Sequence, residues 1–283
     1  MNNNNQNSQR LNQNQTNKAG SSTGVIEKKV LSRSAEDKEN WLADKIAEEV
    51  AIAFSYNGQN HAVMMASPIQ LNDFAIGFSY TEKIIDSFND ILNIDIQTAK
   101  QGICINLQIK PNLIERLESR KRGLSGRSGC GICGITDLAS AMPKLTPLQK
   151  TKLPNHQTIR RAVEVLHKNQ SLQDQCGAVH CAALFDSTGV MAAIREDVGR
   201  HNALDKLIGS NINTINNQYF ILMSSRASHE LVAKTVIAGV GTLVCISAAT
   251  SLAIEMAQEY NLNLIGFIRG DRQIVYTESN DYK

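Results

Sequence analysis

The chain has 283 residues, of which 42% are hydrophobic, so it is long enough to bury a core in one or two domains. Its formal net charge of +2 argues against nucleic acid as a partner, and the lack of an apolar run of about 18 residues argues against a membrane span. The start also lacks the apolar run of a secretory signal, so we expect a cytoplasmic protein whose six cysteines are free, catalytic or metal-bound.

The first part of the chain combines a polar tail with a small domain. Residues 1–24 are rich in Asn and Gln and are predicted to be a disordered tail. Residues 25–115 are predicted to form a small α+β domain, with strands over 49–56, 61–66, 91–100 and 103–110 and a helix over 71–85. The Asn57-Gly58 pair is a strong hairpin signal between the first two strands. Cys104 alternates with apolar neighbours and is expected in the core.

Residues 116–155 are predicted to be a basic segment, a flexible CxxC loop and a linker. The loop has the sequence Gly129-Cys130-Gly131-Ile132-Cys133-Gly134. So much glycine is unusual in a core strand or a helix interior, which indicates an exposed loop. Five cationic residues precede the two thiols: Arg116, Arg120, Lys121, Arg122 and Arg127. Nearby cations stabilise a thiolate, which is both the nucleophile and the metal ligand, so the loop is suited to sulfur chemistry.

Residues 156–279 are predicted to form a three-layer α/β domain. The expected helices cover 159–168, 202–208, 229–240 and 251–260, and the expected strands cover 179–185, 190–194, 219–223, 243–246, 262–268 and 274–277. Short apolar strands that alternate with helices imply crossover connections, and therefore a sheet that is parallel in part.

Polar residues gather where the strands of this domain end. Four segments have this character: 195–202, 224–229, 247–251 and 269–272. They contain Arg195, Arg200, Arg226, Arg269 and Arg272. Ligands of open α/β sheets bind outside the carboxyl ends of strands, where helix N-termini and arginines favour anions. The pattern predicts a pocket for a phosphorylated ligand, although ordinary helix caps and solvated arginines remain an alternative.

At this point the residues resemble a known family. The block from Arg195 to Lys206, Arg-Glu-Asp-Val-Gly-Arg-His-Asn-Ala-Leu-Asp-Lys, resembles the most distinctive segment of the FdhD family, the accessory sulfurtransferases of formate dehydrogenase. Further segments agree in the same order: 73–78 with Thr81-Glu82, the Cys130–Gly134 loop, 224–228, 247–250, 266–267 and 275–277. The resemblance covers about residues 45–279 and rests mainly on the long charged block.

The resemblance implies a role in sulfur transfer. Members take sulfur from a cysteine desulfurase as a persulfide and deliver it to the molybdenum (or tungsten) bis-guanine-dinucleotide cofactor before insertion into formate dehydrogenase. The persulfide carrier would be Cys130, and the spacing suggests that Cys133 expels the sulfur. The family's cofactor-binding segment matches Phe267, Ile268, Arg269, Gly270, Asp271 and Arg272. Further candidates from the strand-end segments are Arg200, His201, Asn202, Ser224, Ser225 and Arg226.

The resemblance also implies a cytidine-deaminase-like fold for the larger domain and a homodimer. The metal cofactor is expected as a bound substrate, and neither a permanent cofactor nor a metal site is expected. The chain departs from the family at Cys176 and Cys181, which are extra thiols. A zinc-binding structural module is therefore the alternative, with Cys130 and Cys133 joined by Cys176, Cys181 or His180.

Two catalytic alternatives fit the sequence less well. A zinc deaminase needs a Glu two residues after its ligand, and here His180 is followed by Cys181 and Ala182. A thioredoxin-like oxidoreductase places CxxC at a helix N-terminus directly after a strand, and no clear strand precedes Cys130.

Overall fold

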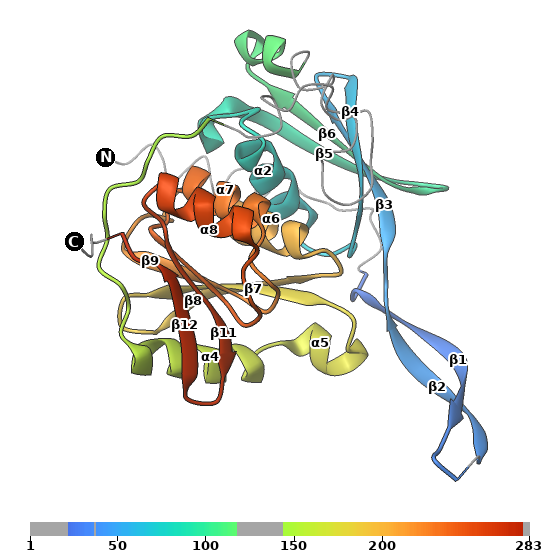
Figure 1. Ribbon diagram of the computed structural model, residues 1–283. Coiled ribbons are helices and arrows are strands. Elements are labelled where there is room, and N and C mark those ends of the chain that lie inside the picture. The colour runs from blue at the N-terminus through green and yellow to red at the C-terminus, as the bar shows by residue number, and fades with distance from the viewer. Residues whose placement is uncertain (1–21, 37, 118–143, 280–283) are drawn as a thin grey trace.

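The computed structural model describes residues 22–36, 38–117 and 144–279. These residues form a mixed α/β fold with three sheets of six, four and two strands (Figure 1). The CxxC loop, with Cys130 and Cys133, lies outside the described residues. Within them, no helix combines the length and the hydropathy that crossing a membrane requires.

The six-stranded sheet has the order β12-β11-β10-β9-β7-β8. Its strands are β7 (His180–Asp186), β8 (Met191–Asp197), β9 (Tyr219–Met223), β10 (Thr242–Cys245), β11 (Asn263–Arg269) and β12 (Arg272–Thr277). The central strands β9, β10 and β11 are parallel, and β7, β8 and β12 run antiparallel to their neighbours. The central strands are buried on both faces, which explains why they read as continuous apolar runs in the sequence.

Helices cover both faces of this sheet, so it is the middle of three layers (Figure 1). On one face lie α6 (Arg200–Ser210), α7 (His229–Ile237) and α8 (Ser251–Glu259), whose apolar residues form one core cluster with the sheet. On the other face, α4 (His156–Lys168) contributes Ile159, Ala162 and Leu166 to a second cluster. The short helix α5 (Ser171–Cys176) follows α4 and was not predicted.

The four-stranded sheet has the order β4-β3-β6-β5 and carries α2 (Leu71–Thr81) on one face. Its strands are β3 (Val50–Tyr56), β4 (Gln59–Ala66), β5 (Ile91–Ala99) and β6 (Gly102–Ile109), with short 3-10 turns at Phe88–Asp90 and Pro111–Leu113. Two of its strand pairs are the predicted antiparallel hairpins, and β3 lies parallel to β6 between them.

The expected burial of Cys104 is wrong, because its side chain is exposed. Its neighbour Ile105 is fully buried, so along β6 Cys104 points to the face opposite α2.

Helix α2 ends earlier than predicted, at Thr81 instead of residue 85. Lys83 takes a left-handed conformation (φ 53°), its N–H donates to Tyr80 O, and the next N–H donates to Ser79 O. This pair of hydrogen bonds is the Schellman arrangement that terminates helices. The apolar residues Ile84 and Ile85, which extended the predicted helix, are buried in the turn that follows.

Two glycines allow α2 to cross α6 at close range. A Cβ on Gly77 would lie 1.7 Å from Asp205 O, and a Cβ on Gly209 would lie 2.0 Å from Asp73 O. No side chain fits at either point, so the backbones of the two helices touch. This crossing joins the four-stranded sheet to the six-stranded sheet.

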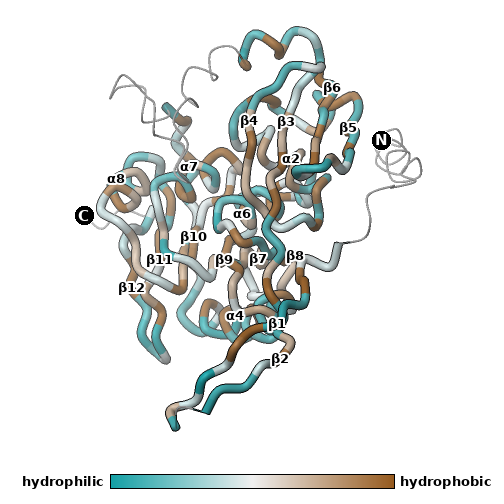
Figure 2. The backbone as a smooth tube through the Cα atoms, turned by 90° about the vertical axis from the view of Figure 1, so that its right-hand side faces the viewer, coloured by the Kyte–Doolittle hydropathy of each residue, from teal (hydrophilic) through white to brown (hydrophobic). Residues whose placement is uncertain are grey.

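Strands β1 (Val25–Arg33) and β2 (Glu39–Ala47) form a two-stranded ribbon that projects from the rest of the molecule (Figure 1). We call residues 25–47 the arm. The sequence pattern predicts no strands here. Figure 2 shows the arm continuing from the end of the four-stranded sheet, on the same side of the molecule.

Candidate functional site

A pocket of about 470 Å³ opens where the parallel strands β9 and β10 end. The residues that line it are His180, Arg200, Ser224, Ser225, Arg226, Ser247, Ala248, Ala249 and Thr250. They come from the start of β7, the start of α6 and the loops that follow β9 and β10. The structure thus brings three of the four predicted strand-end segments to one place, at the edge of the sheet where such ligands bind.

The two loops that follow β9 and β10 are joined by backbone hydrogen bonds. Ala227 N donates to Ala248 O (3.1 Å), and Thr250 N donates to Ala227 O (3.1 Å). These bonds place the first turns of α7 and α8 side by side. The first N–H groups of a helix have no partners within the helix, and the helix dipole adds partial positive charge there. Small residues at these positions let a ligand approach the backbone.

Two guanidinium groups give the pocket its charge. Arg200 begins α6, and Arg226 lies exposed in the loop after β9. Burial lowers the pKa of His180, and the positive charges of Arg200, His201 and Arg226 lower it further. His180 is therefore neutral at physiological pH and can accept or donate a hydrogen bond without adding charge. The positive field that acts on His180 would equally attract a phosphate.

A second hollow of about 740 Å³ adjoins the first, and His180 and Ser224 line both. Its other lining residues are His167, Gln170, Gln173, Asp174, Gly177, Ala178, Val179 and Ile246. This lining mixes polar and apolar residues, includes the carboxylate of Asp174 and lacks the arginines of the first pocket. The sequence pattern does not predict this hollow, because most of its lining lies on the unpredicted helix α5 or directly beside it. An elongated ligand could place a charged part in the first pocket and a neutral polar part in the second.

A buried carboxylate holds the turn that carries Arg200. Asp197 accepts hydrogen bonds from Gly199 N (2.8 Å), Asn202 Nδ2 (3.0 Å) and Ser67 N (3.1 Å). It also forms an ion pair with Lys206 Nζ (2.6 Å). The side chains of Asp197 and Lys206 are fully buried. Burial lowers the pKa of Lys206, and the carboxylate of Asp197 opposes this change. The charged form of the Lys206 side chain is therefore stabilised by Asp197. Asp197 thus fixes the start of α6 relative to β8.

Three residues of the charged block have structural partners. Asn202 is buried and donates to Met65 O (2.8 Å) and to Asp197. His201 pairs with the carboxylate of Glu230 on α7. Arg195 pairs with Asp73 (2.7 Å) at the start of α2. None of these three residues lines either pocket. The predicted role of His201 and Asn202 in cofactor binding therefore stays a prediction.

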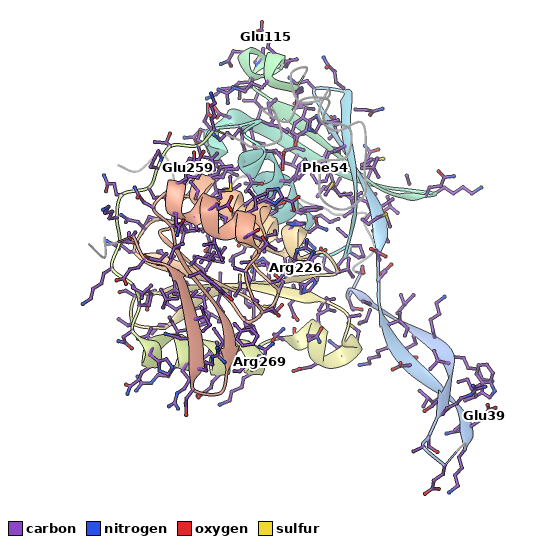
Figure 3. All side chains as sticks on the ribbon, viewed as in Figure 1. Glu39, Phe54, Glu115, Arg226, Glu259 and Arg269 are labelled. Carbon is purple, nitrogen blue, oxygen red and sulfur yellow. The ribbon has the colours of Figure 1, made fainter. Side chains whose placement is uncertain are left out.

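The segment from Phe267 to Arg272 lies beside the pockets and does not line them. It forms the end of β11 and the turn into β12, and includes Gly270 with φ 55°. Phe267 N and Ile268 N donate to Ser247 O and Ile246 O, which ties the segment to residues that line the two pockets. Figure 3 labels Arg226 near the middle of the molecule and Arg269 at a separate place below it.

Two guanidinium groups of this segment stack on one ring. Arg269 and Arg272 lie 5.3 and 5.4 Å from the centre of the Phe267 ring. The Arg269 side chain also donates to Ile246 O (3.1 Å). Asp271 turns toward α4, where it pairs with Arg160 (3.2 Å). The segment is a second cationic surface next to the pocket, and its part in cofactor binding stays a prediction.

The extra thiols of this chain are structurally placed. Burial raises the pKa of Cys181, which is fully buried. Cys176 is half-buried, and its Sγ donates to Leu172 O (3.1 Å). In the described part of the chain, no three His, Cys, Asp or Glu residues group so as to hold a metal ion. The alternative zinc site, in which these thiols join Cys130 and Cys133, stays a prediction, because Cys130 and Cys133 lie outside the described residues.

Comparisons with known proteins agree on one family. A sequence profile described as the FdhD/NarQ family matches residues 47–282. The sulfur carrier protein FdhD of Cupriavidus necator is 41% identical over 235 residues, which is 82% of each chain. The protein of the same name from Bordetella bronchiseptica is 39% identical over 240 residues, which is 83% of this chain and 86% of its own.

A solved structure shares the fold. A crystal structure from Desulfotalea psychrophila, assigned as a formate dehydrogenase accessory protein, matches with a TM-score of 0.69 and 21% identity, over 90% of this chain and 98% of its own. The finer likeness to cytidine deaminases stays a prediction. The family profile and the identity over most of the chain show that the chain belongs to the FdhD/NarQ family.

Proposed function

We propose that this chain is a sulfur carrier that serves the maturation of formate dehydrogenase. Two relatives that carry the name sulfur carrier protein FdhD support this role, as does the match to the family profile. The observation that carries the proposal is the cationic pocket formed by Arg200, Arg226 and His180 beside the first turns of α7 and α8. Such a pocket suits the phosphates of a dinucleotide, which is what a guanine-dinucleotide cofactor presents as substrate.

In the first step the Cys130 thiolate attacks the outer sulfur of a persulfide on a cysteine desulfurase. A new S–S bond forms at Cys130 while the donor's S–S bond breaks, and the donor cysteine leaves as a thiolate. No electrons are gained or lost overall, because the sulfane sulfur only changes its partner. The basic residues before the loop favour the thiolate form of Cys130.

In the second step Cys133 thiolate attacks the inner sulfur of the Cys130 persulfide. A Cys130–Cys133 disulfide forms, and the outer sulfur leaves as hydrosulfide, which becomes a ligand of the bound molybdenum cofactor. The two electrons carried by the hydrosulfide come from the two cysteines. A dithiol reductant must therefore reduce the disulfide before the next cycle, which a cytoplasmic location provides.

A persulfide experiment tests the first step. The wild-type chain and the variants Cys130→Ala, Cys133→Ala and Cys104→Ala are incubated with a desulfurase and cysteine, and protein-bound sulfur is measured by intact mass. We expect Cys130→Ala to carry no extra sulfur. Cys104→Ala, which removes a thiol that is exposed in the structure, should load like the wild type. Full loading of Cys130→Ala would contradict the assignment.

A binding experiment tests the pocket. Guanosine diphosphate serves as the probe, and calorimetry compares the double variant Arg200→Ala/Arg226→Ala with Arg269→Ala/Arg272→Ala. Loss of two cationic phosphate contacts should weaken binding by at least about 30-fold. We expect the Arg200→Ala/Arg226→Ala variant to show this loss of affinity. A loss confined to the second pair would move the phosphate site to the β11–β12 turn.

A further inference from the structure

The two arginines of the pocket are carried by different elements. Arg200 is the first residue of α6, and Arg226 lies in the loop just before α7. A phosphate held by two guanidinium groups needs them at a fixed separation, because each offers directed N–H donors. The described hydrogen bonds of Asp197 tie the start of α6 to β8 and to Ser67, and none of them reaches α7. A separate contact must therefore set the distance between the starts of the two helices.

That contact is the pair formed by His201 and Glu230. His201 follows Arg200 in the first turn of α6, and its Nε2 lies against a carboxylate oxygen of Glu230 in the first turn of α7. The two side chains are only 14% and 18% exposed. Solvent and salt screen a largely buried pair much less than an exposed one. The pair therefore joins the pocket ends of α6 and α7.

A second pair lies one helical turn deeper, with the charges exchanged between the helices. Asp205 follows His201 by four residues on α6, and Lys234 follows Glu230 by four residues on α7. Lys234 Nζ pairs with Asp205 (2.8 Å). Because residues four apart share one face of a helix, the two pairs lie one above the other along the same contact. The deeper pair joins the helices in the interior, and the outer pair fixes their ends at the pocket.

The carboxylate of Glu230 is only partly satisfied by this pairing. Its Oε1 is buried, makes no hydrogen bond with any residue that the structure describes, and lies 4.0 Å from His229 Nε2. A buried acceptor without a donor is costly. Replacing a buried ion pair by apolar side chains often leaves stability unchanged, so stability alone gives little reason for a carboxylate here. This cost points to a role for Glu230 in the pocket.

We propose that Glu230 is a positioning residue for the phosphate pocket. It holds His201, and with it the first turn of α6, so that Arg200 and Arg226 bind the same ligand. Glu230 does not line the pocket and acts through Arg200. Its negative charge would repel a phosphate, and the pairing with His201 offsets that charge. The inference rests on the phosphate pocket of the proposed function and assigns the residue that makes the two arginines a clamp.

A double-mutant cycle tests whether Glu230 acts through Arg200. Glu230→Gln keeps the size of the side chain and removes its charge, and calorimetry measures the dissociation constant for guanosine diphosphate. We expect an increase of about tenfold, because a guanidinium displaced by about 1 Å loses its hydrogen-bond geometry. In an Arg200→Ala chain the same substitution should change the constant less than about twofold, because the group through which it acts is gone.

Three further measurements separate positioning from general damage. His201→Gln removes the other half of the pair and should weaken binding as much as Glu230→Gln, and the double variant should be no weaker than either single variant. Inorganic pyrophosphate, a probe without a base, should show the same ratio between wild type and Glu230→Gln. Glu255→Gln makes the same change at an exposed position of α8 and should alter the dissociation constant less than about twofold.

Thermal melting establishes that each variant is folded. Wild-type affinity in Glu230→Gln, or an equal loss with and without Arg200, would overturn the positioning role while leaving the pocket in place. If the wild type does not bind guanosine diphosphate, or if Arg200→Ala binds it as tightly as the wild type, the phosphate pocket itself is wrong and this inference fails with it. Persulfide loading of Cys130 uses no residue of the pocket and reports on the sulfur chemistry separately.

Discussion

His180 illustrates how position changes the chemistry of one side chain. It begins β7, lines both pockets and is close enough to Arg200 and Arg226 for their charges to affect its titration. From the sequence, His180 is a candidate only for binding zinc, together with thiols such as Cys176 and Cys181. The structure shows that it instead faces an anion-attracting pocket. Its lowered pKa keeps the imidazole uncharged in the same pocket as two guanidinium groups.

The pH dependence of stability should report this environment. Because the pKa of His180 is lowered in the folded chain, only the unfolded chain takes up its proton as the pH falls below about 6.5. The wild type therefore loses stability as the pH falls, until the lowered pKa is passed. His180→Gln removes this contribution, so between about pH 7.5 and pH 5.5 the variant should lose less unfolding free energy than the wild type, as measured with urea. Substitution of the exposed His167 controls for loss of an imidazole. Parallel curves for wild type and His180→Gln would contradict the prediction.

The Asp197–Lys206 pair should be one of the costliest contacts to break. Asp197→Asn keeps the size of the side chain but leaves the buried Lys206 ammonium without its carboxylate, with a hydrogen bond to Ser67 O (2.9 Å) and the ring of Phe74 at 5.7 Å still in place. Breaking a buried pair in this way typically costs about 3–5 kcal/mol. Asp271→Asn removes a carboxylate that is 85% exposed and should change stability by less than about 0.5 kcal/mol. Urea denaturation of both variants checks the difference.

At the scale of elements, the sequence predicted the helices and strands that carry a strong pattern. The strand over 219–223 has the predicted bounds, and the helices that begin at 71, 229 and 251 start where predicted. The arm escaped prediction because charged and apolar residues share both of its faces, so no alternation marks it. Helix α5 escaped because it has only six residues. The pocket could be anticipated only as a set of strand ends, since which loops meet depends on the strand order.

The α2–α6 crossing gives a sharp prediction about one glycine. In an open helix, Gly→Ala stabilises by about 1 kcal/mol. At Gly77 the added methyl would lie 1.7 Å from Asp205 O, which belongs to a backbone and cannot rotate away. Gly77→Ala should therefore destabilise the chain by about 3 kcal/mol, as measured by urea denaturation. A stabilised variant would show that the helices do not cross at this distance.

At the scale of the whole molecule, α2 is shared between the two larger sheets. Phe74 and Phe78 are buried in the cluster of the four-stranded sheet. Tyr80 packs against both this cluster and the cluster of the six-stranded sheet, and its hydroxyl donates to Ile237 O (3.2 Å) in the last turn of α7. The division into domains over 25–115 and 156–279 stays a prediction, and this shared helix suggests that the two parts unfold together.

Lys234 allows that coupling to be tested. Its ammonium, on α7, donates to Thr81 Oγ1 of α2 (2.8 Å) and to both carboxylate oxygens of Asp205 on α6 (2.8 and 2.9 Å). Burial would lower the pKa of Lys234, but the carboxylates of Asp205 and Glu82 raise it above its ordinary value, so the group is charged. Lys234→Met leaves Asp205 buried without its cation and should destabilise the chain by about 3–5 kcal/mol. Since the contact joins both sheets, hydrogen exchange should accelerate by the same factor in β6 and in β9. Acceleration confined to β9 would show instead that the two sheets open independently and that α2 does not couple them.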